Sequence, residues 1–110
     1  MIQVSIFKNR NNECVGFRTS GHAGAEEPGH DIVCAAVSML VMNTMNSIEQ
    51  FTDANTSQVS DDTDGVIEYQ ILSNPTERTE LLMDSMILGL QSLEDDPDYT
   101  AYIDLIFEEV

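Results

Sequence analysis

Apolar and polar residues alternate at the start of the chain, as in a β-strand that buries one face. Polar residues separate Ile2, Val4 and Ile6, and the alternation resumes at Val15 and Phe17 after the polar segment 9–12. Successive side chains of a strand point to opposite sides of the sheet. The pattern therefore predicts a hairpin with strands near 2–8 and 13–20.

A helical composition follows, from Ile32 to about Phe51, where Ala, Met and Leu are frequent and neither Gly nor Pro occurs. Asp31 is a good N-cap, so we expect the helix to begin just after it. Apolar positions at helical spacing trace one face: Val33, Val37, Leu40, Thr44 and Ile48. The first half is apolar nearly all round, so we expect it to be buried on more than one side.

The second half of the chain is expected to contain two strands, a helix and a last strand. Strands are expected over 58–60 and 66–72, around the turn-rich DDTDG, and a last strand over 102–107. The helix should begin at Asn74-Pro75, because Asn74 can cap, Pro75 suits the first helical position and Glu77 completes a box-like arrangement. It should end near Leu93. Its apolar stripe is Leu81, Leu82, Met83, Met86, Ile87 and Leu90.

This ββαββαβ order has no repeat and no long linker, which predicts one domain over residues 1–110. The expected class is α+β, with two helices packed on one mainly antiparallel sheet. No apolar run approaches the roughly 20 residues of a membrane span, and the N-terminus lacks the features of a signal peptide. We therefore expect a soluble, cytoplasmic protein without membrane contact, whose two cysteines form no disulfide framework.

The charge is strongly negative, with 20 acids against 4 bases and a net charge of -16. Residues 1–30 are balanced, whereas residues 31–110 hold Arg78 against 17 acids. Direct nucleic-acid binding is disfavoured, because phosphate contacts need clustered Lys and Arg. The acidity either attracts a basic partner or only keeps the protein soluble.

The candidate catalytic residues lie in the segment GHAGAEEPGHDIVCAAVS, residues 21–38. With Asp31 as the N-cap, Cys34 occupies the third helical position, near unsatisfied N–H groups that lower a thiol pKa. His22 lies twelve residues earlier, and the glycines of the loop permit turns that fold it back over the helix start. A Cys–His pair of this kind performs nucleophilic acyl transfer, and the helix N–H groups can hold an oxyanion.

Two other interpretations of this segment stay open. Cys34 can be a small core residue, and Glu26 and Glu27 oppose a thiolate because nearby negative charge raises a thiol pKa. A metal site could use four residues of suitable type: His22, His30, Asp31 and Cys34. The spacing H-x7-H-x3-C matches no compact zinc finger, however, so we expect no metal.

Neighbouring residues carry weaker signals. His30 precedes the expected cap, where it can be solvated, and is the less favoured base. Ser38 lies one turn after Cys34 on the same helix face and could hydrogen-bond near it. Asp31 could orient His22, although capping is its default role. Cys14 has no histidine near it in sequence, which favours a structural role.

The motif GHAG-x4-G-x-DIVCAAVS resembles the ribosomal-processing cysteine proteases known as Prp. Chain length, the start at residue 2 and the ββαββαβ order extend the resemblance to essentially the whole chain, although only the pattern matches after about Phe51. The resemblance implies that Cys34 is the nucleophile and His22 its base. It further implies supporting or substrate-binding roles at matching motif positions: Gly21, Ala23, Gly24, Asp31 and Ser38.

The resemblance also implies a substrate and an assembly. Members of that family remove a short N-terminal extension from large-subunit ribosomal protein twenty-seven, after a pair of phenylalanines, and support ribosome assembly. They form homodimers, their glycine-rich loop is thought to move for substrate entry, and no cofactor is expected. The alternative is an acidic ribosome-assembly protein that binds a basic ribosomal protein without catalysis.

Overall fold

The structure is a computed structural model that describes residues 1–21, 28–61 and 65–110. Seven strands and helices and one 3-10 turn follow along the chain: β1 (Ile2–Lys8), β2 (Cys14–Ser20), α1 (Pro28–Phe51), β3 (Thr56–Asp61), β4 (Val66–Ile71), α2 (Glu77–Asp95), η1 (Thr100–Tyr102) and β5 (Ile103–Glu109). The expected ββαββαβ order is confirmed.

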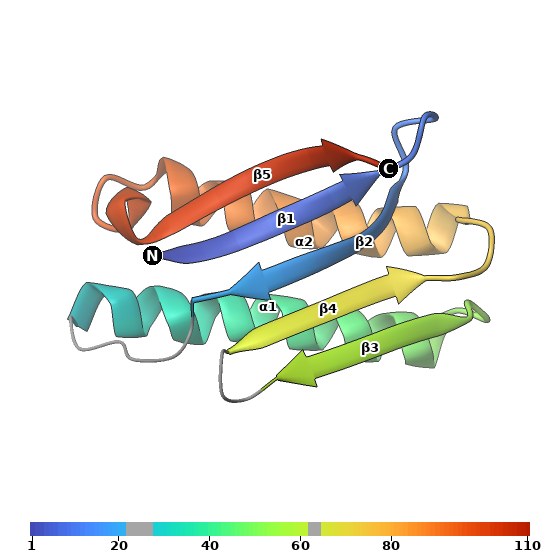
Figure 1. The fold of residues 1–110 in the computed structure, drawn as a ribbon, viewed down its shortest axis with the longest axis horizontal. Coiled ribbons are helices and arrows are strands. Elements are labelled where there is room, and N and C mark those ends of the chain that lie inside the picture. Colours follow the sequence, from blue (N-terminus) through green and yellow to red (C-terminus); the bar gives the residue numbers. More distant parts are fainter. Residues whose placement is uncertain (22–27, 62–64) are drawn as a thin grey trace.

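The strands form one five-stranded sheet in the order β3-β4-β2-β1-β5 (Figure 1). Three neighbouring pairs are antiparallel, and β1 pairs with β5 in parallel. Ile6 of β1 is opposite Phe17 of β2, so the alternating apolar residues of the first hairpin share one face. The prediction of a mainly antiparallel sheet in an α+β fold is thereby confirmed.

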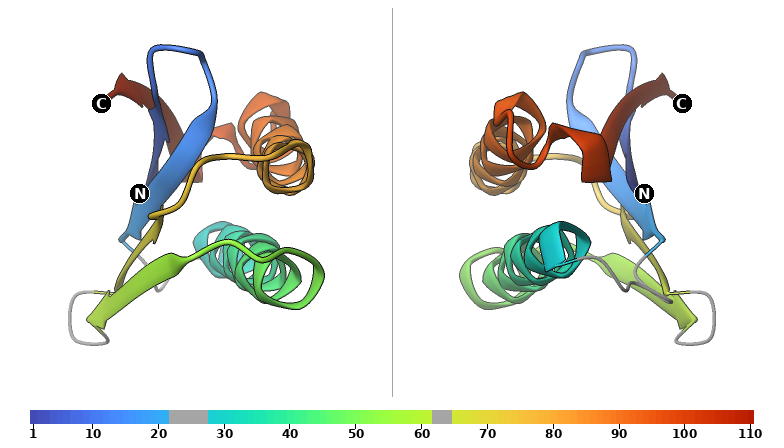
Figure 2. Two further views of the ribbon diagram at one scale, coloured as in Figure 1. Left: turned by 90° about the vertical axis from the view of Figure 1, so that its right-hand side faces the viewer. Right: turned by 90° about the vertical axis from the view of Figure 1, so that its left-hand side faces the viewer.

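Both helices cover the same face of the sheet, as the two end views of Figure 2 show. The core lies between the layers and includes Val37 of α1, Leu90 of α2 and Tyr69 of β4, all buried. The helices also touch each other, because a Cβ atom at Gly89 would lie 2.9 Å from Cδ2 of Leu40. Among the described residues, no helix lies against the opposite face of the sheet (Figure 2).

The start of α1 differs from the prediction. The helix begins at Pro28 rather than after Asp31, so Asp31 lies inside the first turn and is not the N-cap. Proline fits the first helical position, because its fixed φ suits a helix and the N–H it lacks would have no partner there. Cys34 is consequently the seventh residue of the helix instead of the third.

The outer side of α1 is more exposed than expected. Val33 and Val37 are buried, but Ile32, Met39 and Met42 are at least half exposed, so burial on more than one side was a wrong expectation. By length and composition alone, Gly29–Phe51 could cross a membrane. The core helix of a globular protein passes the same test, and α1 packs one face into this core.

The second helix also starts later than predicted. Thr76, not Asn74, is the N-cap of α2, and its hydroxyl accepts a hydrogen bond from the Thr79 N–H in a reciprocal capping box. The helix continues to Asp95, past the expected end at Leu93. Leu81, assigned to the apolar stripe, is 71% exposed, whereas the last four residues of the stripe are buried: Met83, Met86, Ile87 and Leu90.

Candidate active site

Strand β2 ends at Ser20, and Gly21 is the last residue described before the glycine-rich segment. Gly21 has φ +91, and a Cβ atom there would fall on the carbonyl oxygen of Met1, so only glycine fits this turn without strain. The predicted base His22 lies outside the described residues. So do the predicted supporting residues Ala23 and Gly24, and also Glu26 and Glu27. The described chain resumes at the first turn of α1.

Cys34 is half-buried in the second turn of α1. Burial raises the pKa of its thiol, a hydrogen bond with the Ser38 side chain lowers it, and the Asp31 carboxylate raises it, with a net upward shift. The expected lowering by the helix start is wrong in this conformation, because the extra turn moves the unsatisfied N–H groups away from the sulfur. The thiol is therefore protonated at neutral pH, and a nucleophilic reaction needs a base to remove its proton.

Ser38 and Asp31 both lie near Cys34, as the motif suggested, but they act in opposite directions. The Ser38 hydroxyl stabilises the thiolate by a hydrogen bond, since its effect is to lower the thiol pKa. Asp31 is exposed, and its negative charge opposes the thiolate. Ser38 therefore supports a reactive thiol, whereas Asp31 does not do so through its charge.

His30 is buried rather than solvated. It is 8% exposed, and its Nδ1 atom is inaccessible and without a hydrogen-bond partner among the described residues. Its ring meets the ring of Tyr102 edge-on, with centroids 6.4 Å apart and planes at 88°. Sequence reasoning missed Tyr102, because this contact joins residues 72 positions apart and no local pattern encodes it.

Cys14 is fully buried at the start of β2, as its predicted structural role requires. Burial raises the pKa of its thiol to about 11. The sulfur donates to the carbonyl oxygen of Gly16 at 3.4 Å. An inaccessible, protonated thiol is a poor nucleophile, and of the two cysteines only Cys34 is partly accessible.

Within the described ranges, no three His, Cys, Asp or Glu side chains lie close enough together to hold a metal ion.

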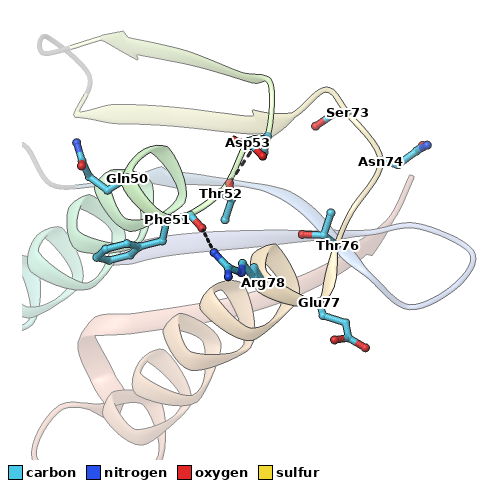
Figure 3. A pocket seen from close by; sticks show the side chains of 10 residues that line it. Gln50, Phe51, Thr52, Asp53, Ser73, Asn74, Thr76, Glu77 and Arg78 are labelled. Atoms are coloured by element: carbon cyan, nitrogen blue, oxygen red, sulfur yellow. Dashed lines mark hydrogen bonds between the residues drawn. The ribbon is translucent and has the colours of Figure 1, made fainter.

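A cavity of about 1000 Å³ lies at the other end of α1, between the end of that helix and the start of α2 (Figure 3). Arg78 borders it and donates from Nη1 to the Phe51 carbonyl oxygen at 3.0 Å. Its described lining contains no cysteine or histidine, so it is separate from the Cys34 site.

Known proteins are similar to this chain in both sequence and fold. The family described as cysteine protease Prp matches residues 1–104. The ribosomal processing cysteine protease Prp of Staphylococcus aureus is 29% identical over 96 residues, which cover 87% of this chain and 91% of that protein.

Two crystal structures of the S. aureus protease superpose on the fold. The complex with a substrate peptide has a TM-score of 0.91 at 28% identity and covers 98% of this chain and 100% of the other. The complex with a covalently linked product peptide has a TM-score of 0.86 at 29% identity, with the same coverage. These similarities show that the chain, which carries a half-buried cysteine near the start of α1, belongs to the Prp family of cysteine proteases.

Proposed function

We propose that this cysteine protease is a cytoplasmic endopeptidase that removes the short N-terminal extension of large-subunit ribosomal protein twenty-seven. The observation that carries the proposal is the position of Cys34. Cys34 is half-buried on α1 and forms a hydrogen bond with the Ser38 side chain. It lies within the motif GHAG-x4-G-x-DIVCAAVS. The S. aureus relative is a ribosomal processing protease that has been crystallised with a substrate peptide, which supports the same class of substrate here.

In the proposed mechanism Cys34 is the nucleophile and His22 the general base. Because the pKa of the Cys34 thiol is raised, the proton moves from Sγ to His22 as the sulfur attacks the scissile carbonyl carbon. The tetrahedral intermediate collapses to a thioester, and the leaving amine takes the proton from the imidazole. Water, deprotonated by the same histidine, then hydrolyses the thioester and restores the thiol.

The decisive experiment is incubation of the protein with the extended ribosomal protein of the same genome, followed by mass spectrometry. Cys34→Ala and His22→Ala should abolish the cleaved product. Cys14→Ala is the matched control, because it removes an inaccessible thiol and should leave cleavage intact. Tight binding without product in the wild-type protein would instead favour the non-catalytic alternative.

The negative charge of residues 31–110 supports a role in attracting this basic substrate. We expect cleavage of the full-length ribosomal protein to slow as salt is added, whereas cleavage of a short uncharged extension peptide should not. If added salt slowed the cleavage of both substrates equally, the negative charge would have no role in attracting the full-length substrate.

We also propose that the protein acts as a homodimer. The exposed apolar residues Ile32, Met39 and Met42 on α1 are consistent with a further contact surface. Sedimentation equilibrium should give twice the mass of the 12.2 kDa chain, and a monomer mass at working concentration would contradict the proposal.

A further inference from the structure

The first turn of α1 is in contact with a residue from the far end of the chain. A Cβ atom built on Gly29 would lie 2.5 Å from Cε2, 2.8 Å from Cζ and 3.0 Å from Oη of Tyr102. The Tyr102 ring therefore lies directly against the helix backbone at Gly29. No side chain larger than hydrogen fits between them unless the ring or the turn moves.

The neighbouring residue strengthens this contact. His30 places its buried ring edge-on to the same tyrosine, at a centroid distance of 6.4 Å. Perpendicular aromatic pairs at this separation attract each other beyond the burial of their surface. Gly29 and His30 thus both lie against the ring of Tyr102, and we call these three residues the helix-start clasp.

Tyr102 is itself held in place by the connection between α2 and β5. The Tyr102 N–H donates to the Tyr99 carbonyl at 2.9 Å, and the Tyr99 N–H donates to the Asp96 carbonyl at 3.0 Å. Tyr102 also directly precedes β5, which pairs with β1 inside the sheet. The clasp therefore ties the start of α1 to a hydrogen-bonded part of the fold.

The clasp is one helical turn from the nucleophile. His30 and Cys34 are four residues apart on α1, and Cys34 and Ser38 are again four apart, so all three lie on the same side of the helix. Helix ends fray, because the first N–H groups have no partner within the helix. Fraying of this first turn would move the backbone that precedes Cys34.

We propose that Gly29, His30 and Tyr102 are positioning residues, which hold the first turn of α1 so that the Cys34 thiol stays aligned for attack. The proposal rests on the nucleophilic role of Cys34 and assigns no chemistry to the clasp itself. It gives His30 a role through its ring and not as a base. Small misplacement of a reacting group costs large factors in rate, so the clasp should affect turnover more than stability.

The test compares size changes at the two sides of the contact. Gly29→Ala should lower kcat by about tenfold or more, with KM changed by less than about twofold, because the added methyl displaces the ring or the turn. Tyr102→Ala should lower kcat by a similar factor, and Gly29→Ala/Tyr102→Ala should be no worse than Tyr102→Ala alone. Such non-additivity is the signature of direct contact.

Two matched variants make the result specific. Gly89→Ala is another glycine-to-alanine change in a helix, but its new methyl meets the end of the flexible Leu40 side chain, so kcat should be unchanged. Tyr102→Phe keeps the ring and should retain kcat within about threefold. The comparison of Tyr102→Ala with Tyr102→Phe also tests the contact without adding an atom to α1, should Gly29→Ala fail to fold.

A second readout does not depend on the natural substrate. This readout is the rate at which iodoacetamide alkylates Cys34, measured as a function of pH. The pH profile should change in Gly29→Ala and in Tyr102→Ala, while the melting temperature of each stays within a few degrees of the wild type. In Gly89→Ala the profile should match that of the wild type. If the proposed substrate is wrong, cleavage fails in the wild-type protein but this alkylation pattern remains.

Three results would overturn the proposal. The first is Gly29→Ala with wild-type kcat and alkylation. The second is additive losses in the double variant, since residues in contact should not act independently. The third is loss of activity by a factor of about one hundred or more in His30→Phe, which keeps the ring but removes both nitrogens. That loss would make His30 a catalytic base, whereas the clasp predicts that His30→Phe remains active.

Discussion

Glu80 connects the second helix to the first hairpin through a single partly buried carboxylate. Its Oε2 atom accepts a hydrogen bond from the Cys14 N–H at 3.1 Å. Its Oε1 atom is inaccessible and has no partner among the described residues. Glu80→Ala should remove the acceptor and leave a buried N–H unsatisfied, at a cost of about 1–3 kcal/mol. For a chain of this size that is about 4 °C in melting temperature for each kcal/mol.

The charge of Glu80 has the opposite effect on stability from its hydrogen bond. Burial raises the pKa of this carboxyl most strongly; the Cys14 N–H and Lys8 lower it, and Asp84 and Glu13 raise it further, with a net upward shift. A group whose pKa is higher in the folded state than in the unfolded state favours folding while it is protonated. It loses this contribution as the pH rises through the folded-state pKa. Ionised Glu80 therefore costs stability at neutral pH.

Glu80→Gln separates the two effects, because glutamine keeps an oxygen acceptor for the Cys14 N–H but carries no charge. Its free energy of unfolding relative to the wild type should increase from about pH 5 to about pH 8. The Cys14 thiol, with a pKa of about 11, does not titrate in this range. Urea unfolding of both proteins at several pH values gives the difference in their free energies of unfolding. Every pH used should lie above the isoelectric point near 4.1.

The comparison of the two variants decides the outcome. Glu80→Ala should be less stable than Glu80→Gln at every pH, since only alanine lacks the acceptor. A stability difference between Glu80→Gln and the wild type that does not change with pH would refute the assignment of a raised pKa. Equal losses in both variants would refute the hydrogen bond as the source of the stabilisation.

Three further substitutions test other parts of the structure. Ser38→Ala should raise the pKa of the Cys34 thiol, so that alkylation at neutral pH slows while its rate at high pH is unchanged. Thr76→Ala removes the N-cap of α2 and should cost about 1 kcal/mol in urea unfolding, whereas Thr76→Ser should cost little. Gly21→Ala should lower the melting temperature by several degrees, because φ is +91 and the new methyl would meet the Met1 carbonyl; a wild-type melting temperature would contradict the described turn.

The strands were predictable because the alternation of apolar residues directly encodes which face of the sheet is buried. Ile2, Val4 and Ile6 are all fully buried, and the first two strands begin and end within one residue of the predicted bounds. Helix starts were less predictable, because several residues can cap and the surrounding structure selects one. Asp31 and Asn74 are good caps by composition, yet α1 begins at Pro28 and α2 is capped by Thr76.

The sequence distinguished the two cysteines but did not predict the surroundings of Cys34, and the nucleophilic role of Cys34 stays a prediction. Cys34 stood out by its position near a helix start, and the structure keeps it accessible while Cys14 is buried. The thiol pKa was predicted in the wrong direction, because that argument depended on a helix start four residues too late. The contact of Tyr102 with Gly29 depends on how the chain folds back on itself, which no local pattern records. The predicted role of His22 stays a prediction.

The parallel pairing of β1 with β5 has a consequence for the order in which the sheet can form. β1 lies between β2, its neighbour in sequence, and β5, whose residues follow about one hundred positions later, as in the pair Ile2 and Ile103. The hairpin of β1 and β2 closes a short loop, whereas the pairing of β1 with β5 closes a loop that contains most of the chain, and such long-range contacts form slowly. Loss of Ile103–Glu109 would therefore leave one edge of the buried strand β1 without its hydrogen-bond partners.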